Sequence, residues 1–185
     1  MSYDNKFPLI FIHVPKCAGT SVRRLFASWF RGGFFTHYLT ESTKTLDNKI
    51  NDLALSKSHN SCVFGHFNME RGFGVLDSYP SVEQFVTILR DPFDQFVSEY
   101  LYLGQKSSMF KLDENLFGKY LMDKNPNYLN HFPVKVTIDN YCNVIDRKFL
   151  FIGIFENLEV SLVKISEILS KQYTENTVLK LKAGN

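Results

Sequence analysis

The segment from Leu9 to Phe30 constrains the fold of this 185-residue chain more than any other stretch. It opens with LIFIHV, an apolar run that has the length and the β-branched content of a buried strand. Pro15 then ends that strand, because proline has no N–H to donate to a central ladder. Apolar residues next recur with helical spacing, at Val22, Leu25, Phe26 and Trp29. The segment therefore predicts a strand, a tight turn and a helix.

The turn between these two elements has the composition of an anion site. Its residues are one lysine, three small residues and two hydroxyl residues: Lys16, Cys17, Ala18, Gly19, Thr20 and Ser21. A helix N-terminus presents unpaired N–H groups and the positive end of the helix dipole, so we expect an anion, most often a phosphate, to bind here. The pattern differs from G-x-x-x-x-G-K-[ST], because Lys16 precedes the glycine. The alternative is an ordinary strand–helix unit with Lys16 exposed and Thr20 or Ser21 as the N-cap.

A histidine follows the second apolar run, SCVFGHF, which spans residues 61–67. The pair Gly65-His66 would place the imidazole near a strand end, and ligands bind at the carboxyl ends of strands in open α/β sheets. Imidazole is also the side chain best suited to proton transfer near neutral pH. His66 is therefore a candidate general base; the alternative is a partly buried structural histidine.

An arginine follows the third apolar run, FVTIL. Arg90 is followed by Asp91 and Pro92, which suit the N-cap and the first position of a helix. Ser98 lies about two turns into that helix. A guanidinium fork and a hydroxyl together suit a terminal phosphate. The alternative is an arginine paired with Asp91 or Asp94, with the serine exposed.

A fourth strand is expected at 149–155, followed by an amphipathic helix at 156–170. Strands that are apolar at nearly every residue and alternate with helices predict an α/β fold in three layers. Its mostly parallel sheet would have four to five strands and helices on both faces. We expect one domain over residues 1–185. The weaker patterns predict helices at 41–57 and 113–122, a helix or irregular crossover at 136–145, and a loop at 68–80. In such a sheet Lys16, His66 and Arg90 each follow a strand, so they should meet at one edge.

Composition narrows the classes of function. The net charge of +2 gives no polybasic footprint for a nucleic acid. Cys17, Cys62 and Cys142 are widely spaced, which indicates neither a disulfide framework nor a zinc site, and no other metal-ligand spacing is visible. The sequence shows neither a signal-peptide pattern nor an apolar run long enough to span a membrane, so we expect a soluble, cytoplasmic protein.

Taken together, the motifs resemble those of the sulfotransferases that use 3′-phosphoadenosine 5′-phosphosulfate (PAPS). The segment FIHVPKCAGTS resembles their 5′-phosphosulfate loop, and ILRDPFDQFVSEY resembles their 3′-phosphate segment, usually R-D-P-x-x-R-x-x-S-x-Y. FGHF resembles the segment that carries the general-base histidine, while DNYCN and FIGIFENL resemble later segments with further nucleotide contacts. These matches occur in family order over most of residues 7–170. They are most similar to the carbohydrate and heparan-type branch, which is Golgi-type and membrane-associated; this chain would be a short, soluble member.

The resemblance implies transfer of a sulfuryl group from PAPS to an acceptor hydroxyl, with carbohydrate favoured, PAP as the product and no metal. Lys16 and the turn from Cys17 to Ser21 would hold the 5′-phosphosulfate, with Lys16 also stabilising the departing phosphate. Arg90 and Ser98 would bind the 3′-phosphate, and His66 would take the acceptor's proton.

The chain departs from the family pattern in two ways. Gln95 stands where the family often has arginine, so we expect one phosphate contact to be weakened. Many relatives continue beyond the position of Asn185, so we expect part of the acceptor pocket to be missing or to come from a partner chain. The oligomeric state is left open by the sequence.

Two other functions compete with this interpretation. An atypical P-loop kinase or NTPase would bind ATP in the presence of magnesium, and the position of Lys16 argues against it. A non-catalytic sulfotransferase-like module would bind a nucleotide or a partner without turnover, and would bind PAP without transferring a sulfuryl group to any acceptor.

Overall fold

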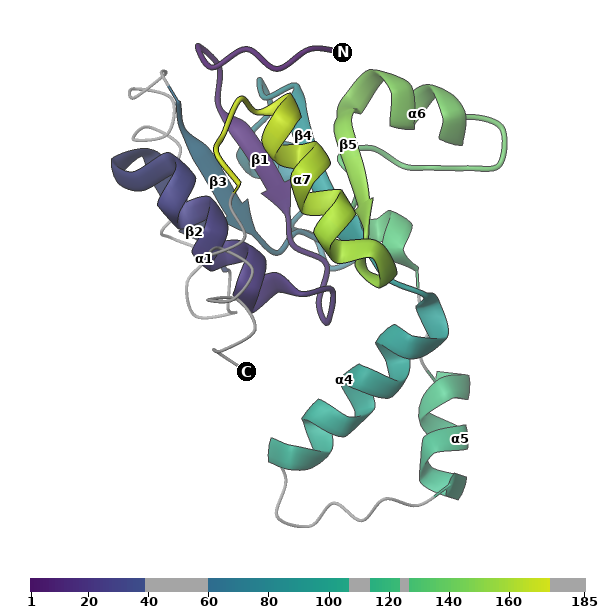
Figure 1. The fold of residues 1–185 in the computed structure, drawn as a ribbon. Coiled ribbons are helices and arrows are strands. Elements are labelled where there is room, and N and C mark those ends of the chain that lie inside the picture. The colour runs from purple at the N-terminus through teal and green to yellow at the C-terminus, as the bar shows by residue number, and fades with distance from the viewer. Residues whose placement is uncertain (39–59, 107–113, 124–126, 174–185) are drawn as a thin grey trace.

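A five-stranded parallel sheet forms the centre of the computed structural model, which describes residues 1–38, 60–106, 114–123 and 127–173 (Figure 1). The order across the sheet is β2-β3-β1-β4-β5, and all four pairings are parallel. The strands are β1 (Leu9–Ile12), β2 (Phe34–His37), β3 (Cys62–Gly65), β4 (Gln84–Leu89) and β5 (Phe149–Ile154). The α/β prediction and its four strands are thus confirmed, whereas β2 was missed: it is a short, half-exposed edge strand without a long apolar run.

Helices connect the strands and extend beyond the sheet. They are α1 (Gly19–Phe30), α3 (Val75–Ser78), α4 (Pro92–Lys106), α5 (Glu114–Asp123), α6 (Tyr141–Lys148) and α7 (Leu158–Ile168), with 3-10 turns η1 (Arg31–Gly33), η3 (Tyr128–His131) and η4 (Phe155–Asn157). In Figure 1, α1 and α7 lie on the viewer's side of the sheet, and α4 and α5 project away from it. Within the described residues, no helix is both long enough and apolar enough to cross a membrane.

Two local predictions need correction. The segment 68–80 is not all loop, because Gly74 N–H donates to Asp77 Oδ2 at 2.7 Å and this contact closes the first turn of α3. At 136–145, where a helix or an irregular crossover was expected, helix α6 begins only at Tyr141. Asn140 Oδ1 accepts a hydrogen bond from Thr137 N–H at 2.7 Å, which holds the preceding residues in a turn. The helix expected at 41–57 lies outside the described residues.

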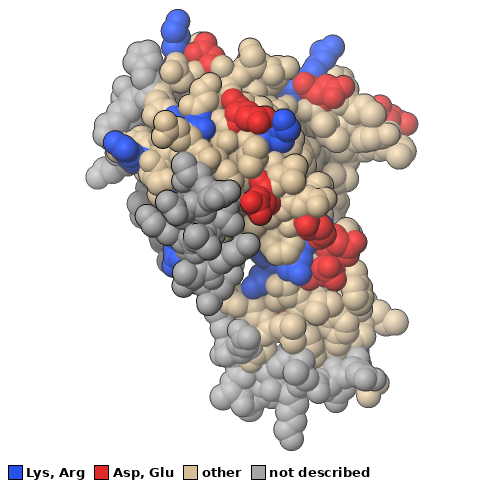
Figure 2. Space-filling view, in the orientation of Figure 1, with Lys and Arg blue, Asp and Glu red and all other residues tan. Residues whose placement is uncertain are grey.

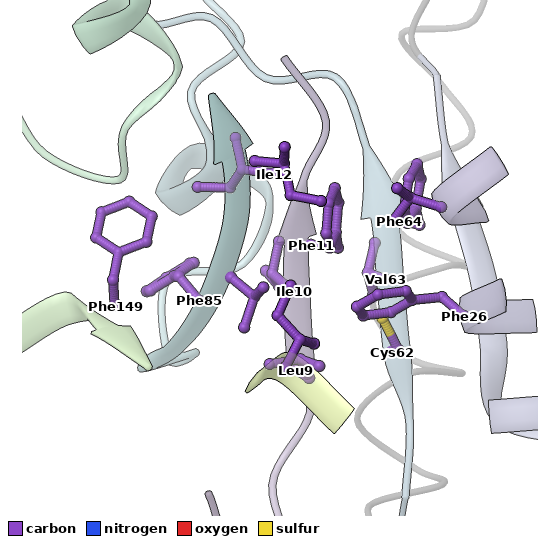
Figure 3. Packing of buried hydrophobic residues seen from close by; sticks show 14 of the residues in the cluster. Leu9, Ile10, Phe11, Ile12, Phe26, Cys62, Val63, Phe64, Phe85 and Phe149 are labelled. Carbon is purple, nitrogen blue, oxygen red and sulfur yellow. The ribbon is translucent and has the colours of Figure 1, made fainter. Parts of the chain in front are cut away.

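The core is rich in aromatic side chains that pack between the sheet and α1. Every residue of β1 is at most 1% exposed, as expected for a central strand that is covered on both faces. Phe11 stacks on Phe64 with ring centroids 4.4 Å apart, and Phe26 of α1 meets Phe11 edge-on at 4.8 Å (Figure 3). Burying each of these rings contributes about 1.5–3 kcal/mol. The packing fixes α1 against β1 and β3, and with it the turn that joins β1 to α1.

The three central strands end at the same edge of the sheet, where β1 and β3 stop in register and β4 continues two residues further, to Leu89. Ile12 lies beside Gly65 of β3 and Thr87 of β4. Two hydrogen bonds tie these ends together: His13 N–H donates to Gly65 O at 2.7 Å, and Thr87 Oγ1 donates to Ile12 O at 2.8 Å. The residues that follow β1, β3 and β4 therefore emerge side by side at one edge of the sheet.

Candidate active site

A cleft of about 500 Å³ lies at this edge. Eight of the nine residues predicted from the sequence line it, namely Lys16, Ala18, Gly19, Thr20, Ser21, His66, Arg90 and Ser98. The exception is Cys17, whose side chain is buried and points its thiol at Pro15 O. Burial raises the pKa of that thiol to about 12, so Cys17 is unreactive, and any contact it makes in the cleft comes from its backbone.

The turn before α1 leaves the start of the helix open. The N-cap is Ala18, in the left-handed region at φ 60°, and no side chain caps the helix. This excludes the alternative in which Thr20 or Ser21 is the N-cap. Lys16 is also left-handed, at φ 65°. A left-handed conformation costs a non-glycine residue about 1–3 kcal/mol, so the surrounding packing has to impose this shape. The resulting turn directs uncapped N–H groups toward the cleft.

Two cations face the cleft, and no acidic side chain among the described residues lines it. The Lys16 ammonium lies 4.1 Å from the ring centroid of Tyr102, and the Arg90 guanidinium lies 4.4 Å from that of Phe155. Neither cation forms an ion pair within the described part of the chain. Figure 2 shows Lys and Arg atoms beside Asp and Glu atoms near the point where α4 and α5 extend from the sheet.

Arg90 in particular is placed to receive an anion. Its Nη1 donates to Lys16 O at 3.5 Å, while its buried Nε has no hydrogen-bond partner among the described residues. The alternative in which Arg90 pairs with Asp91 or Asp94 is not observed. Asp91 Oδ1 instead accepts from the N–H groups of Phe93 and Asp94 at 3.0 and 3.1 Å, which confirms it as the N-cap of α4. A buried donor without a partner is costly, and an oxyanion in the cleft would satisfy it.

The tautomer of His66 is set by the backbone. Its Nδ1 lies 2.6 Å from His13 O. A carbonyl can only accept, so Nδ1 carries the proton and Nε2 of the neutral ring keeps a lone pair. Burial lowers the pKa of His66, which keeps the ring neutral at physiological pH. This is the state that a general base needs before the reaction.

The sequence analysis missed His13, which also lines the cleft. Its ring stacks on His66 at 4.3 Å, and its Nδ1 lies 3.1 Å from Tyr38 Oη. A Cβ on Gly19 would lie 1.6 Å from His13 Nε2, so only glycine fits beneath this ring. Burial, aided by the nearby His66 and Arg23, lowers the pKa of His13 to about 3. Strand alternation could have indicated this role, because position 13 faces the same side as Phe11, toward α1.

A second cavity of about 280 Å³ adjoins the cleft and shares Pro15 and His66 with it. Its other walls come from residues 67–73, from α4 and from residues 127–131. Helix α4 contributes to both spaces: Ser98 and Tyr102 line the cleft, whereas Gln95 and Glu99 line the second cavity, together with Phe96. His66 therefore lies between the cleft and the second cavity.

Gln95 does not line the cleft where a phosphate would bind. It is 6% exposed, and its Nε2 donates to Pro15 O at 3.2 Å. The side chain thus supports the turn before α1 from the side of the second cavity. Sequence reasoning also missed His131, whose Nδ1 lies 2.5 Å from Phe67 O in that cavity.

Comparison with known proteins identifies the family. A family model described as "Sulfotransferase family" matches residues 1–177. The chain belongs to the sulfotransferase family. Its fold is similar to that of mouse sulfotransferase SULT7A1, crystallised in complex with PAP, with a TM-score of 0.61 and 13% sequence identity. That match covers 98% of this chain but only 65% of the mouse protein, so the chain spans about two thirds of its length. A search of curated proteins found no match.

Proposed function

We propose that this sulfotransferase-family chain moves a sulfuryl group from PAPS to a hydroxyl of a carbohydrate acceptor and releases PAP. The observation that carries the proposal is the meeting of Lys16, Arg90, His66 and an uncapped helix N-terminus in one cleft. Membership of the sulfotransferase family supports the same chemistry. Within the described residues, no group of three His, Cys, Asp or Glu side chains is placed to hold a metal ion.

The donor would be held at both of its anionic ends. The N–H groups at the start of α1 and the hydroxyls of Thr20 and Ser21 would bind the 5′-phosphosulfate. Arg90 and Ser98 would bind the 3′-phosphate, which distinguishes PAPS from ATP and ADP. Sulfuryl transfer resembles phosphoryl transfer, because charge spreads over equatorial oxygens while the entering and leaving oxygens lie in line. The protein contributes mainly positioning and preorganised positive charge.

The reaction would proceed by direct displacement. The acceptor oxygen forms a bond to sulfur as the bond between sulfur and the 5′-phosphate oxygen breaks. The acceptor's proton passes to Nε2 of His66, the ring nitrogen that the His13 carbonyl leaves free. Lys16 stabilises the negative charge that develops on the departing phosphate. The position of His66 between the two cavities supports this role, since a base must reach the acceptor beside the donor.

Calorimetric titration with PAP, ADP and ATP tests the donor site. We expect PAP to bind at least tenfold more tightly than ADP, because a charge-assisted hydrogen bond contributes about 1.5–3 kcal/mol. Arg90→Gln should remove most of that preference. Arg147→Gln, which changes an exposed arginine on α6, should leave it intact. Equal binding of PAP and ADP by the unmodified protein would contradict the proposal, and magnesium-dependent preference for ATP would favour a kinase or NTPase.

Transfer of ³⁵S from labelled PAPS to a saccharide panel tests the reaction itself. The expected result is a labelled saccharide whose formation requires His66. Tight PAP binding with no transfer to any acceptor would favour a non-catalytic nucleotide-binding module.

A further inference from the structure

The second cavity offers a ligand carboxylate and imidazole groups as hydrogen-bond acceptors. Two of its amide donors are already engaged: Asn130 Nδ2 donates to Glu70 Oε2 at 2.5 Å, and Gln95 Nε2 donates to Pro15 O at 3.2 Å. The carboxylates of Glu70 and Glu99 keep free lone pairs, since each carboxylate has about four acceptor sites. A ligand that matches such a cavity has to bring donors, and hydroxyl groups are the neutral choice.

His131 adds a further acceptor to the same cavity. Its Nδ1 donates to Phe67 O, so Nε2 holds the lone pair. Burial lowers its pKa, which keeps the ring neutral. His131 and His66 thus share one arrangement: each imidazole is tied through Nδ1 to a backbone carbonyl, and each lines this cavity. A sulfuryl-acceptor molecule with two hydroxyl groups could donate a hydrogen bond to Nε2 of each ring.

The charge of the cavity disfavours an anionic ligand. Glu70 and Glu99 contribute −2 and Arg71 contributes +1, which leaves −1 from its charged side chains. Lys16 and Arg90 belong to the adjoining cleft, where the donor's own phosphates would neutralise them. A carboxylated or sulfated ligand would therefore meet like charge from both the cavity and the donor.

Size and apolar surface indicate a small ring. The volume of about 280 Å³ lies just below the range of about 300–1,000 Å³ that is typical of ligand pockets. Phe73 and Phe96 give the cavity aromatic walls, and such walls can pack against the C–H face of a sugar ring.

We propose that this cavity binds one uncharged sugar-like ring, and that His131 Nε2 accepts a hydrogen bond from the hydroxyl next to the one that is sulfated. The inference rests on the proposed function, which supplies the donor and the role of His66. His131 is then a positioning residue that selects acceptors with two neighbouring hydroxyls. The Glu70 and Glu99 carboxylates exclude polyanionic acceptors.

A matched acceptor panel tests the charge selection. The probes are the methyl glycosides of glucose, galactose, mannose and xylose, with the methyl glucuronide and galacturonide as charged counterparts. We expect ³⁵S transfer to at least one neutral glycoside, with kcat/KM at least about tenfold above that of its uronide. The double variant Glu70→Gln/Glu99→Gln should narrow this ratio, whereas Glu83→Gln, an exposed change before β4, should not. Preference for the uronides, or transfer to neither group despite tight PAP binding, would overturn the inference. Absence of PAP binding would instead defeat the proposed function, and the inference with it.

Monodeoxy glycosides test the role of His131. The unmodified protein should use the analogue that lacks the neighbouring hydroxyl with an acceptor KM about tenfold higher, as expected for loss of one hydrogen bond in a partly buried site. His131→Phe should raise the acceptor KM to a similar extent and leave kcat and the KM for PAPS within about twofold. This variant should also use the parent glycoside and its monodeoxy analogue equally well. A fall in kcat with unchanged acceptor KM would assign His131 to the chemical step and overturn the positioning role. If His131→Phe does not fold, the comparison of acceptors with the unmodified protein decides alone, and equal use of both would refute the proposal.

Discussion

Replacement of His66 tests the proposed mechanism most directly. A positioned general base contributes about 10²–10⁴-fold, which corresponds to about 2.7–5.4 kcal/mol of transition-state stabilisation. His66→Ala should therefore lower kcat by that factor. It also removes the hydrogen bond to His13 O, and that loss should cost about 0.5–1.5 kcal/mol of stability.

His66→Asn separates these two effects. The amide nitrogen of asparagine can donate to His13 O in place of Nδ1, but the side chain offers no base. We expect this variant to recover most of the lost stability and none of the lost turnover. The assays are single-turnover ³⁵S transfer for kcat, calorimetry for PAP affinity and thermal unfolding for stability.

Two outcomes would refute the role of His66 as the general base. PAP affinity should stay within about threefold in both variants, because the proposed anion contacts come from Lys16, Arg90 and the start of α1. Unchanged kcat in His66→Asn would show that another group takes the proton. Loss of PAP binding together with turnover would show that His66 is structural.

Three further predictions concern the turn before α1 and its surroundings. Gly19→Ala should impair both PAP binding and turnover, measured by calorimetry and ³⁵S transfer, because its Cβ would displace the His13 ring; unimpaired binding would refute this. The free energy of unfolding should fall by about 2 kcal/mol between pH 7 and pH 5. The pKa of His13 is 6.5 in the unfolded chain but about 3 in the folded protein, so the unfolded state takes up the proton first. Urea unfolding at both pH values measures this, and His13→Gln should flatten the dependence; an equal slope in that variant would assign the effect to other groups. Gln95→Arg should not strengthen PAP binding, because residue 95 faces the second cavity; a gain of affinity would show that the side chain reaches the phosphate cleft.

The central strands and the convergence of the cleft could be predicted from the sequence because they follow from local patterns. Each of β1, β3 and β4 is a predominantly apolar run, and each is followed by a polar residue suited to anion or proton chemistry. Parallel pairing then brings Lys16, His66 and Arg90 together without any further information.

The missed features depend on contacts between distant segments. The alignment of His131 with Phe67 joins residues 64 positions apart, and no local pattern signals it. Gln95 looks like a lost phosphate ligand in the sequence, yet its side chain turns to the Pro15 carbonyl, 80 positions away. Strand β2 lies at the edge of the sheet and is only partly buried, so its sequence, FFTH, lacks the continuous apolar pattern of the central strand β1.

The placement of α4 between the two spaces has a consequence for how this enzyme family could diversify. Positions 95 and 99 form one stripe along the helix, and positions 98 and 102 form another, each pair one turn apart. Under the proposed function, substitutions on the first stripe would reshape acceptor preference while the second stripe would continue to serve the same donor. A single helix would thus allow new substrates to be adopted without rebuilding the proposed nucleotide site.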